Sequence, residues 1–204
     1  MKILKLLFEQ EQPFSPELFD ALKDFVSNNK TEKLQSKIPE IEKLIASHEY
    51  ENITNPGGVK VYRGMKLTFE EAEALCQGKN CTEEQGKNGV VYRTFKGAGE
   101  LPSKRIVQSW SENPSVGLQF AIDPEVGGEI PVVFATTATQ GKFFGKPGEL
   151  GKIVNPERAS EMETISIGKV GYEGFAMGIP AESWLGRDPH SVDITKLKSL
   201  ILSL

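Results

Sequence analysis

The stretch VKVYRG, residues 59–64, marks the point at which the sequence changes from a helical to a β-like pattern. Before it, apolar residues recur at helical spacing between positions 16 and 26, and a second helix is predicted after Pro39. After it come short runs rich in β-branched and aromatic residues, which are typical of strands. This order predicts an α+β protein, with an N-terminal helical layer (residues 1–55) followed by a mixed-strand core (residues 56–204).

Two helices are expected to interrupt the strands. Thr68 and Glu71 form the pattern of a capping box, and Asn113 before Pro114 is typical of a helix start. Between residues 139 and 160 a glycine-rich stretch has no clear periodicity, and its length favours a working loop over a simple connector. The β-like runs are VVYRTF (90–95), RIVQSWS (105–111), IPVVFATTAT (130–139), METISIG (162–168) and SVDITKLKSLIL (191–202).

The composition limits the classes of function open to the chain. Its 204 residues suit one domain with a helical appendage, and a formal net charge of −4 argues against nucleic acid as a direct partner. Two histidines and two cysteines cannot assemble a metal-ligand cluster, so we expect no metal. No apolar run is long enough to span a membrane. Cys76 and Cys81 could form a local disulfide, but reduced thiols are the favoured interpretation.

The segment PERASEMETISIG, residues 156–168, carries two glutamates separated by one residue at the start of a predicted strand. Residues i and i+2 of a strand share one face, so Glu161 and Glu163 are expected to point the same way. Like charges this close raise each other's pKa, which a folded protein tolerates where a cation or a reaction requires it. The alternative is a solvated edge strand, where exposed glutamates are common.

Two other β-like runs end in residues that suit an anionic ligand. Arg63 is followed by Gly64, so a guanidinium that can clamp a phosphate lies beside closely approachable backbone. Ser109 and Ser111 end another run and share one face by the same period of two. Together with the glutamates, these groups could bind a diphosphate and stabilise a cation that develops beside it.

This set of motifs, at intervals of about fifty residues, resembles the arginine-serine-glutamate class of mono-ADP-ribosyltransferases. That class has an ExE motif and includes binary clostridial toxins and T-even-like phage enzymes. The resemblance covers residues 59–168 and implies a core of two packed small sheets. It also places a helix after the serine motif, with Phe120 as a candidate for stacking on nicotinamide. Ordinary core packing is the alternative for Phe120.

The resemblance implies NAD as the substrate, no metal, and a role for each residue that handles the donor. Glu163 would hydrogen-bond a ribose hydroxyl while Ser109 holds that carboxylate in place. Arg63 would neutralise the pyrophosphate. Ser111 and the backbone of Gly64 would bind on the nicotinamide side.

Glu161 would serve the acceptor, by orienting and partly deprotonating an arginine guanidinium of a target protein. Arg93 competes for the arginine position, but it lacks a following glycine and lies too near Ser109 in the sequence. Two positions depart from the family pattern. Trp110 stands where threonine is usual. Arg158 stands where an aromatic residue often precedes the glutamate pair, and this second departure bears on how the acceptor protein is bound.

The function that the resemblance implies is NAD-dependent mono-ADP-ribosyl transfer to arginine side chains of bacterial host proteins, by a monomer in the host cytoplasm. The alternatives are an NAD glycohydrolase, a transferase to a non-arginine acceptor, and a catalytically lapsed phage head protein. Residues 1–9 resemble a short capsid-targeting tag ending in the cleavage site Leu7-Phe8-Glu9, which would package the chain in a phage head. An amphipathic first helical turn explains the same residues equally well.

Overall fold

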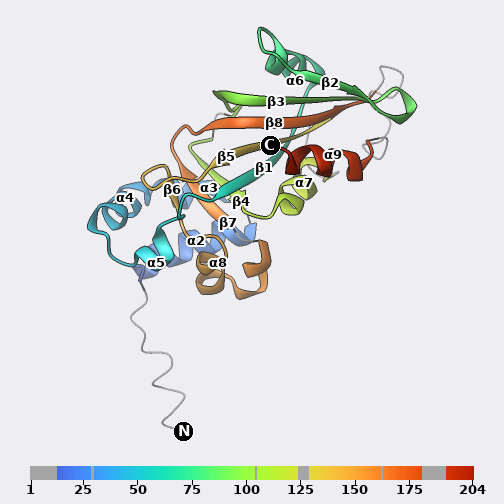
Figure 1. Cartoon of the computed structure of the whole chain (residues 1–204). Helices are drawn as coiled ribbons and strands as arrows, with labels where there is room; N and C mark the ends of the chain where they lie inside the picture. The colour runs from blue at the N-terminus through green and yellow to red at the C-terminus, as the bar shows by residue number, and fades with distance from the viewer. Residues whose placement is uncertain (1–12, 29, 104, 124–128, 162, 181–191) are drawn as a thin grey trace.

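The computed structural model describes residues 13–28, 30–103, 105–123, 129–161, 163–180 and 192–204, and it confirms the α+β class (Figure 1). The predicted capsid-targeting tag lies outside the described residues. The helices are α2 (Pro16–Asn28), α3 (Thr31–Gln35), α4 (Ile38–Ser47), α5 (Glu51–Thr54), α6 (Phe69–Cys76), η1 (Lys87–Gly89), α7 (Pro114–Ile122), α8 (Glu149–Val154), η2 (Pro156–Glu161) and α9 (Ile194–Leu202). The strands are β1 (Lys60–Leu67), β2 (Thr82–Gln85), β3 (Val91–Glu100), β4 (Val107–Ser111), β5 (Ile130–Thr137), β6 (Phe143–Phe144), β7 (Glu163–Ile167) and β8 (Gly171–Ile179).

Two of the N-terminal helices, α2 and α4, form where the sequence predicted them. The Ser15 hydroxyl accepts a hydrogen bond from the backbone N–H of Leu18 at 3.1 Å, which satisfies one of the free donors in the first turn of α2. Pro39 lies in the first turn of α4, where its missing N–H has no intrahelical partner to lose. The buried face of α2 consists of Leu18, Ala21, Leu22, Phe25 and Val26.

The eight strands form one antiparallel sheet in the order β2-β3-β8-β5-β1-β4-β7-β6. The expected core of two packed small sheets is therefore wrong. β1 pairs with β5 along its whole length but with β4 only at Tyr62 and Ser111. The sheet continues through this narrow junction. Strand patterns in a sequence identify single strands, whereas long-range pairing depends on tertiary packing that the pattern does not contain.

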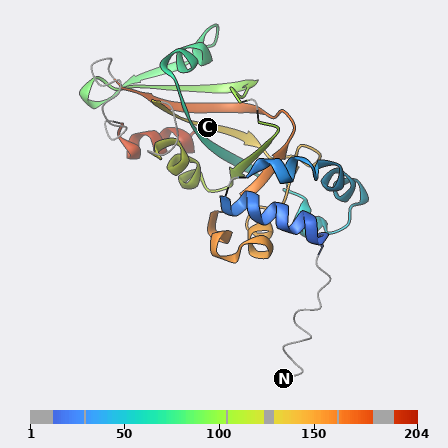
Figure 2. The same ribbon diagram turned by 180° about the vertical axis from the view of Figure 1, so that it is seen from behind.

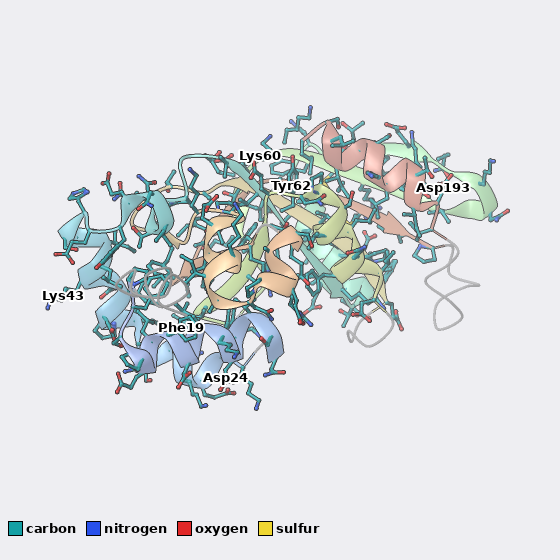
Figure 3. The ribbon with its side chains drawn as sticks, turned by 90° about the horizontal axis from the view of Figure 1, so that it is seen from below. Phe19, Asp24, Lys43, Lys60, Tyr62 and Asp193 are labelled. Carbon is teal, nitrogen blue, oxygen red and sulfur yellow. A yellow bond between two sulfur atoms is a disulfide. The ribbon has the colours of Figure 1, made fainter. Side chains whose placement is uncertain are left out.

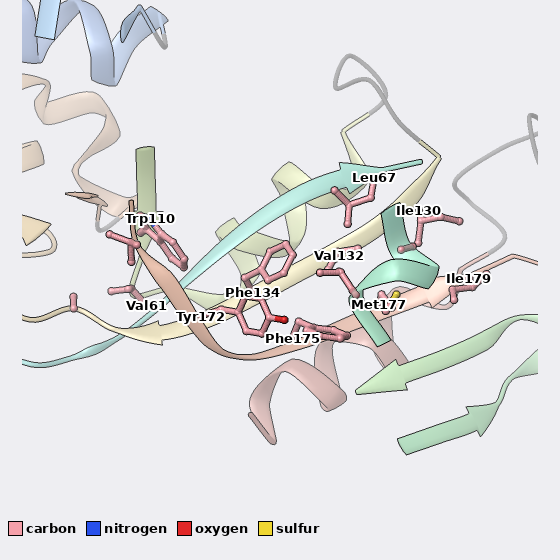
Figure 4. Packing of buried hydrophobic residues seen from close by; sticks show 14 of the residues in the cluster. Val61, Leu67, Trp110, Ile130, Val132, Phe134, Tyr172, Phe175, Met177 and Ile179 are labelled. Atoms are coloured by element: carbon pink, nitrogen blue, oxygen red, sulfur yellow. The ribbon is translucent and has the colours of Figure 1, made fainter. Parts of the chain in front are cut away.

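Side chains of the central strands alternate between two apolar layers, as the period of two requires. Val132 of β5 belongs to one layer, and its neighbour Val133 belongs to the other, which α7 and α9 cover. Figure 4 shows the first layer, in which Phe134 packs against Tyr172 and Phe175 with ring centroids 5.2 and 6.0 Å away. These layers fix the position of β1 relative to α7.

A third apolar layer joins the N-terminal helices to the end of the sheet that β4, β7 and β6 form. Leu18 and Leu22 of α2 lie in one buried cluster with Val107 of β4, Phe144 of β6 and Ile165 of β7. Figures 1 and 2 show the N-terminal helices gathered at that end, and Figure 3 shows α2 alongside α8. Helix α2 therefore packs against the strands that carry the serine and glutamate motifs.

Two predictions of secondary structure are wrong. The run at residues 191–202 contains α9 and no described strand, because Asp193 caps a helix by accepting from the N–H groups of Thr195 and Lys196. The glycine-rich stretch at residues 139–160 is not one long loop, since it contains β6, α8 and most of η2.

Cys76 and Cys81 form a disulfide that closes the turn between α6 and β2. The favoured interpretation of reduced thiols is therefore wrong, and the local disulfide is the arrangement found. The other local signals in this region are confirmed: Thr68 and Glu71 form the capping box of α6, and the Asn113 side chain caps α7. Short-range patterns thus predicted helix starts more reliably than sheet architecture.

Candidate active site

Three polar residues from neighbouring strands are linked by hydrogen bonds where β1, β4 and β7 lie side by side. Arg63 of β1 donates from Nη1 to the backbone carbonyl of Ser109 at 2.5 Å. The Ser109 hydroxyl donates to Oε1 of Glu163, the first residue of β7. The structure thus brings together one residue from each of the three motifs that the sequence singled out.

The pairing of β4 with β7 explains why the serine and glutamate motifs face each other. Ser111 lies opposite Glu163 and Ser109 lies opposite Ile165. The bond between Ser109 and Glu163 is therefore a diagonal contact on one face of an antiparallel pair. Both serines line the same cavity, as expected for residues i and i+2 of a strand.

Glu161 is placed differently from the prediction. It ends η2, whereas β7 begins at Glu163, so the two glutamates do not follow the period of one strand. The backbone carbonyl of Glu161 accepts the hydroxyl of Ser111, and its Oε1 lies 3.7 Å from Nη1 of Arg158. The prediction failed because η2 continues to Glu161, so this residue lies outside the strand that begins at Glu163. The Glu161 carboxylate is still close enough to raise the pKa of Glu163.

A cavity of about 640 Å³ opens over this junction, lined by β1, β4, β7, α7, η2 and the C-terminal end of α2. Four of its lining residues are cationic, namely Arg63, Lys66, Arg105 and Arg158. Glu163 is the only carboxylate among the described residues that line it. The volume falls in the usual range for small-molecule sites, and the excess of positive charge suits an anionic ligand such as a diphosphate.

Glu163 is only 6% exposed, and burial raises the pKa of its carboxyl to about 7. The hydrogen bond from Ser109 acts against this shift, the charge of Glu161 adds to it, and the charges of Arg158 and Arg63 act against it. The second oxygen of Glu163, Oε2, is buried and has no hydrogen-bond partner among the described residues. A buried carboxylate oxygen without a partner can accept a hydrogen bond from a ligand hydroxyl.

Arg63 also keeps an unused donor. Its Nε is buried and has no partner in the described part of the chain. The pKa of Arg63 is lowered to about 10, mainly by burial and also by the charge of Arg105, while the charge of Glu163 opposes both effects. The guanidinium therefore remains charged at neutral pH. A fixed guanidinium with donors to spare suits an oxygen-rich anion.

Gly64 is required by the packing of β1 against α7. A Cβ atom at this position would lie 1.8 Å from the carbonyl oxygen of Gly117 and 2.5 Å from the backbone nitrogen of Ala121. This close approach brings α7 to the cavity, which Phe120 lines while remaining 42% exposed. Phe120 is thus outside the buried core, and its ring is accessible for stacking.

Several residues that line the cavity were not predicted from the sequence. Lys66 follows Arg63 on β1, and Arg105 precedes β4, so their closeness to the motifs was the only signal for them. Ser27 and Asn28, at the end of α2, also line the cavity. No local pattern marks these two, because their position depends on how α2 packs against the sheet.

Arg93, the competitor for the arginine position, lies elsewhere. It forms ion pairs with Glu73 at 2.5 Å and Glu83 at 2.6 Å, and its side chain is 17% exposed. The structure therefore places Arg63, and not Arg93, beside the serine motif. Trp110, between the two serines, packs edge-on against Phe143 with ring centroids 5.8 Å apart.

Comparisons with models of protein families, with curated proteins and with solved structures find no match to this chain. The described residues contain no group of three or more His, Cys, Asp or Glu side chains that could hold a metal ion. Within the same residues, none of the helices is both long enough and apolar enough to cross a membrane.

Proposed function

We propose that this protein is an NAD-dependent mono-ADP-ribosyltransferase that modifies arginine side chains of bacterial host proteins and releases nicotinamide. The observation that carries the proposal is the chain of contacts from Arg63 through Ser109 to Glu163 at the edge of one cavity. These are the residue types, in the order along the chain, on which the resemblance to the arginine-serine-glutamate class rests.

The charges around the cavity support a dinucleotide diphosphate as the ligand. Arg63 has an unpartnered buried Nε, and Lys66 and Arg105 line the same cavity. A diphosphate places two negative charges close together, so more than one cation is needed to neutralise it. Phe120 offers an exposed ring on which the flat nicotinamide could stack.

Glu163 has the position and environment to stabilise the transition state. As the bond between ribose C1′ and the nicotinamide nitrogen breaks, its electron pair leaves with nicotinamide and positive charge develops on the ribose. An ionised carboxylate beside the ribose favours that charge, most strongly in a site that excludes water. Oε2 of Glu163 is free to accept a ribose hydroxyl, because Ser109 holds Oε1.

An arginine acceptor is supported by the Glu161 carboxylate, whose Oε1 lies 3.7 Å from the guanidinium of Arg158 and whose Oε2 has no partner among the described residues. A carboxylate that already faces one guanidinium has the chemistry to orient another. The same ion pair favours a second candidate function, hydrolysis of NAD. While the Glu161 carboxylate is paired with Arg158, water is the favoured acceptor, because water needs less orientation than a guanidinium.

Bacterial host proteins as targets, the host cytoplasm as the place of action and packaging in a phage head rest on the resemblance to T-even-like phage enzymes. The cavity supports the donor chemistry. A catalytically lapsed head protein remains the alternative of another class. The retained contact chain from Arg63 to Glu163 argues against it, since a lapsed site would not need these groups to remain joined.

The test is to incubate the protein with labelled NAD and a bacterial lysate, with Glu163→Gln as the inactive control. We expect label on lysate proteins with the wild type only, and mass spectrometry should map the adducts to arginine residues. Adducts on another residue type would redirect the proposal to a different acceptor. Release of nicotinamide without any adduct would support the glycohydrolase, and no release at all would contradict both.

A further inference from the structure

Arg158 has a place at the cavity that the residues of the proposed donor site do not explain. It belongs to η2 and lines the cavity together with Glu163, and its side chain is 44% exposed. Its charge acts on Glu163, whose pKa it lowers, so the guanidinium lies within electrostatic reach of that carboxylate. Arg158 is therefore both accessible and close to the group proposed to stabilise the reacting ribose.

The contacts of Arg158 hold its guanidinium loosely and through one nitrogen. Nη1 donates to the backbone carbonyl of Val26 at 3.3 Å and lies 3.7 Å from Oε1 of Glu161. In the described part of the chain no partner is found for Nη2. Arg93 provides the contrast, because two carboxylates hold its Nε and Nη1 at 2.6 and 2.5 Å and its side chain is 17% exposed.

A guanidinium beside Glu161 is also what the proposed reaction requires of an acceptor. A carboxylate must orient the guanidinium and receive the proton that the guanidinium loses, because a guanidinium holds its proton strongly at neutral pH. Arg158 meets this condition within its own chain, with Nη2 available as the nucleophile. Holding two reactants in one molecule replaces a bimolecular encounter by an intramolecular step.

We infer that Arg158 is an intramolecular ADP-ribose acceptor, so that the protein modifies itself at this residue before or alongside its targets. The inference rests on the proposed function and adds a modification site to it. The product would carry a bulky dianionic group on η2, next to the end of α2. It would also remove the cationic partner of Glu161 from its present position.

The bond between ribose C1′ and the nicotinamide nitrogen breaks, and neutral nicotinamide leaves with the electron pair. Nη2 of Arg158 forms the new bond to C1′ and loses one proton, which Glu161 accepts and passes to solvent. The products are ADP-ribosyl-Arg158, nicotinamide and one proton, and no further reactant is needed.

The first experiment incubates the full-length protein with NAD alone and follows intact mass and peptide maps. We expect one ADP-ribose per chain, mapped to Arg158, and no adduct on Arg93. The rate constant should not change when the protein is diluted tenfold, because the step is intramolecular. Arg158→Lys keeps the positive charge but removes the guanidinium nucleophile, so the adduct should be lost from this position.

A mixing experiment separates modification within one chain from modification between chains. Wild-type protein is combined with an equal amount of a size-tagged Glu163→Gln chain, which keeps Arg158 but lacks the proposed catalytic carboxylate. We expect label only on the wild-type chain. Equal labelling of Arg158 on both chains would overturn the intramolecular inference, as would mapping of the adduct to another arginine.

A parallel assay with agmatine as a free guanidine acceptor distinguishes failure of this inference from failure of the proposed function. If the wild type modifies agmatine and releases nicotinamide while Arg158 stays unmodified, the self-modification inference is overturned and the proposed function stands. If it neither releases nicotinamide nor modifies agmatine, both are overturned.

Discussion

Glu163 gives a prediction in which loss of activity is coupled to a gain of stability. Its carboxyl has an ordinary pKa of 4.5 but a pKa of about 7 in the folded protein, mainly because it is buried. The folded state therefore holds the proton more tightly than the unfolded state. The stabilisation that this provides is fully present below pH 4.5 and is lost as the pH rises through about 7.

The difference between the two pKa values sets the size of the effect. A shift of one unit corresponds to about 1.4 kcal/mol, so ionised Glu163 destabilises the folded protein by about 3 kcal/mol at pH 8. Glu163→Gln has a similar shape, can still accept from Ser109, and never ionises. Relative to the wild type, the free energy of unfolding of this variant should therefore rise by roughly 2 to 3 kcal/mol between pH 5 and pH 8.

Urea unfolding of both proteins at pH 5, 6, 7 and 8 measures this difference directly. At pH 8 the melting temperature of Glu163→Gln should exceed that of the wild type by roughly 6 to 12 °C. Glu157→Gln is the matched control, because Glu157 is an exposed residue of η2. Its stability should follow that of the wild type at every pH. A Glu163→Gln variant whose difference from the wild type does not change with pH would refute the placement of a buried, ionisable carboxyl at the site.

Other predictions follow from the same geometry. Arg63→Lys keeps the positive charge but loses the planar guanidinium, so it should raise KM for NAD about tenfold in steady-state kinetics. Arg93→Lys should leave KM unchanged. A raised KM for Arg93→Lys with an unchanged KM for Arg63→Lys would exchange the roles of the two arginines. Gly64→Ala would place a Cβ 1.8 Å from the Gly117 carbonyl oxygen, so it should lower the free energy of unfolding, measured with urea, by about 3 kcal/mol or more. Near-wild-type stability of this variant would contradict the packing of β1 on α7. The kcat/KM for NAD should rise with pH through about 7 as Glu163 ionises, and a flat profile would show that its charge is not needed.

The sequence predicted well what depends on neighbouring residues. The capping residues Thr68 and Asn113 start α6 and α7 as expected, because an N-cap acts within one helical turn. The positions of Arg63 and Ser109 on strands were equally predictable, since short β-like runs mark them.

What the sequence could not predict depends on contacts between distant segments. The single sheet results from the pairing of β1 with β4 at one position, which no strand pattern encodes. Ser27 and Asn28 reach the cavity only because α2 packs against the sheet. Glu161 lies outside β7 because η2 continues to that residue, and a pattern of alternating side chains cannot show where a strand begins.

The measurement that tests the central claim most directly is a paired assay on the wild type, Glu161→Gln and Glu163→Gln, with nicotinamide release and transfer to agmatine recorded in the same reaction. The wild type should do both, because it has both carboxylates. Glu163→Gln should do neither, since the charge that stabilises the ribose cation is gone. Glu161→Gln should release nicotinamide but lose transfer, since water needs less orientation and deprotonation than a guanidinium. Full transfer by Glu161→Gln, or turnover of NAD by Glu163→Gln, would contradict the division of roles between the two glutamates.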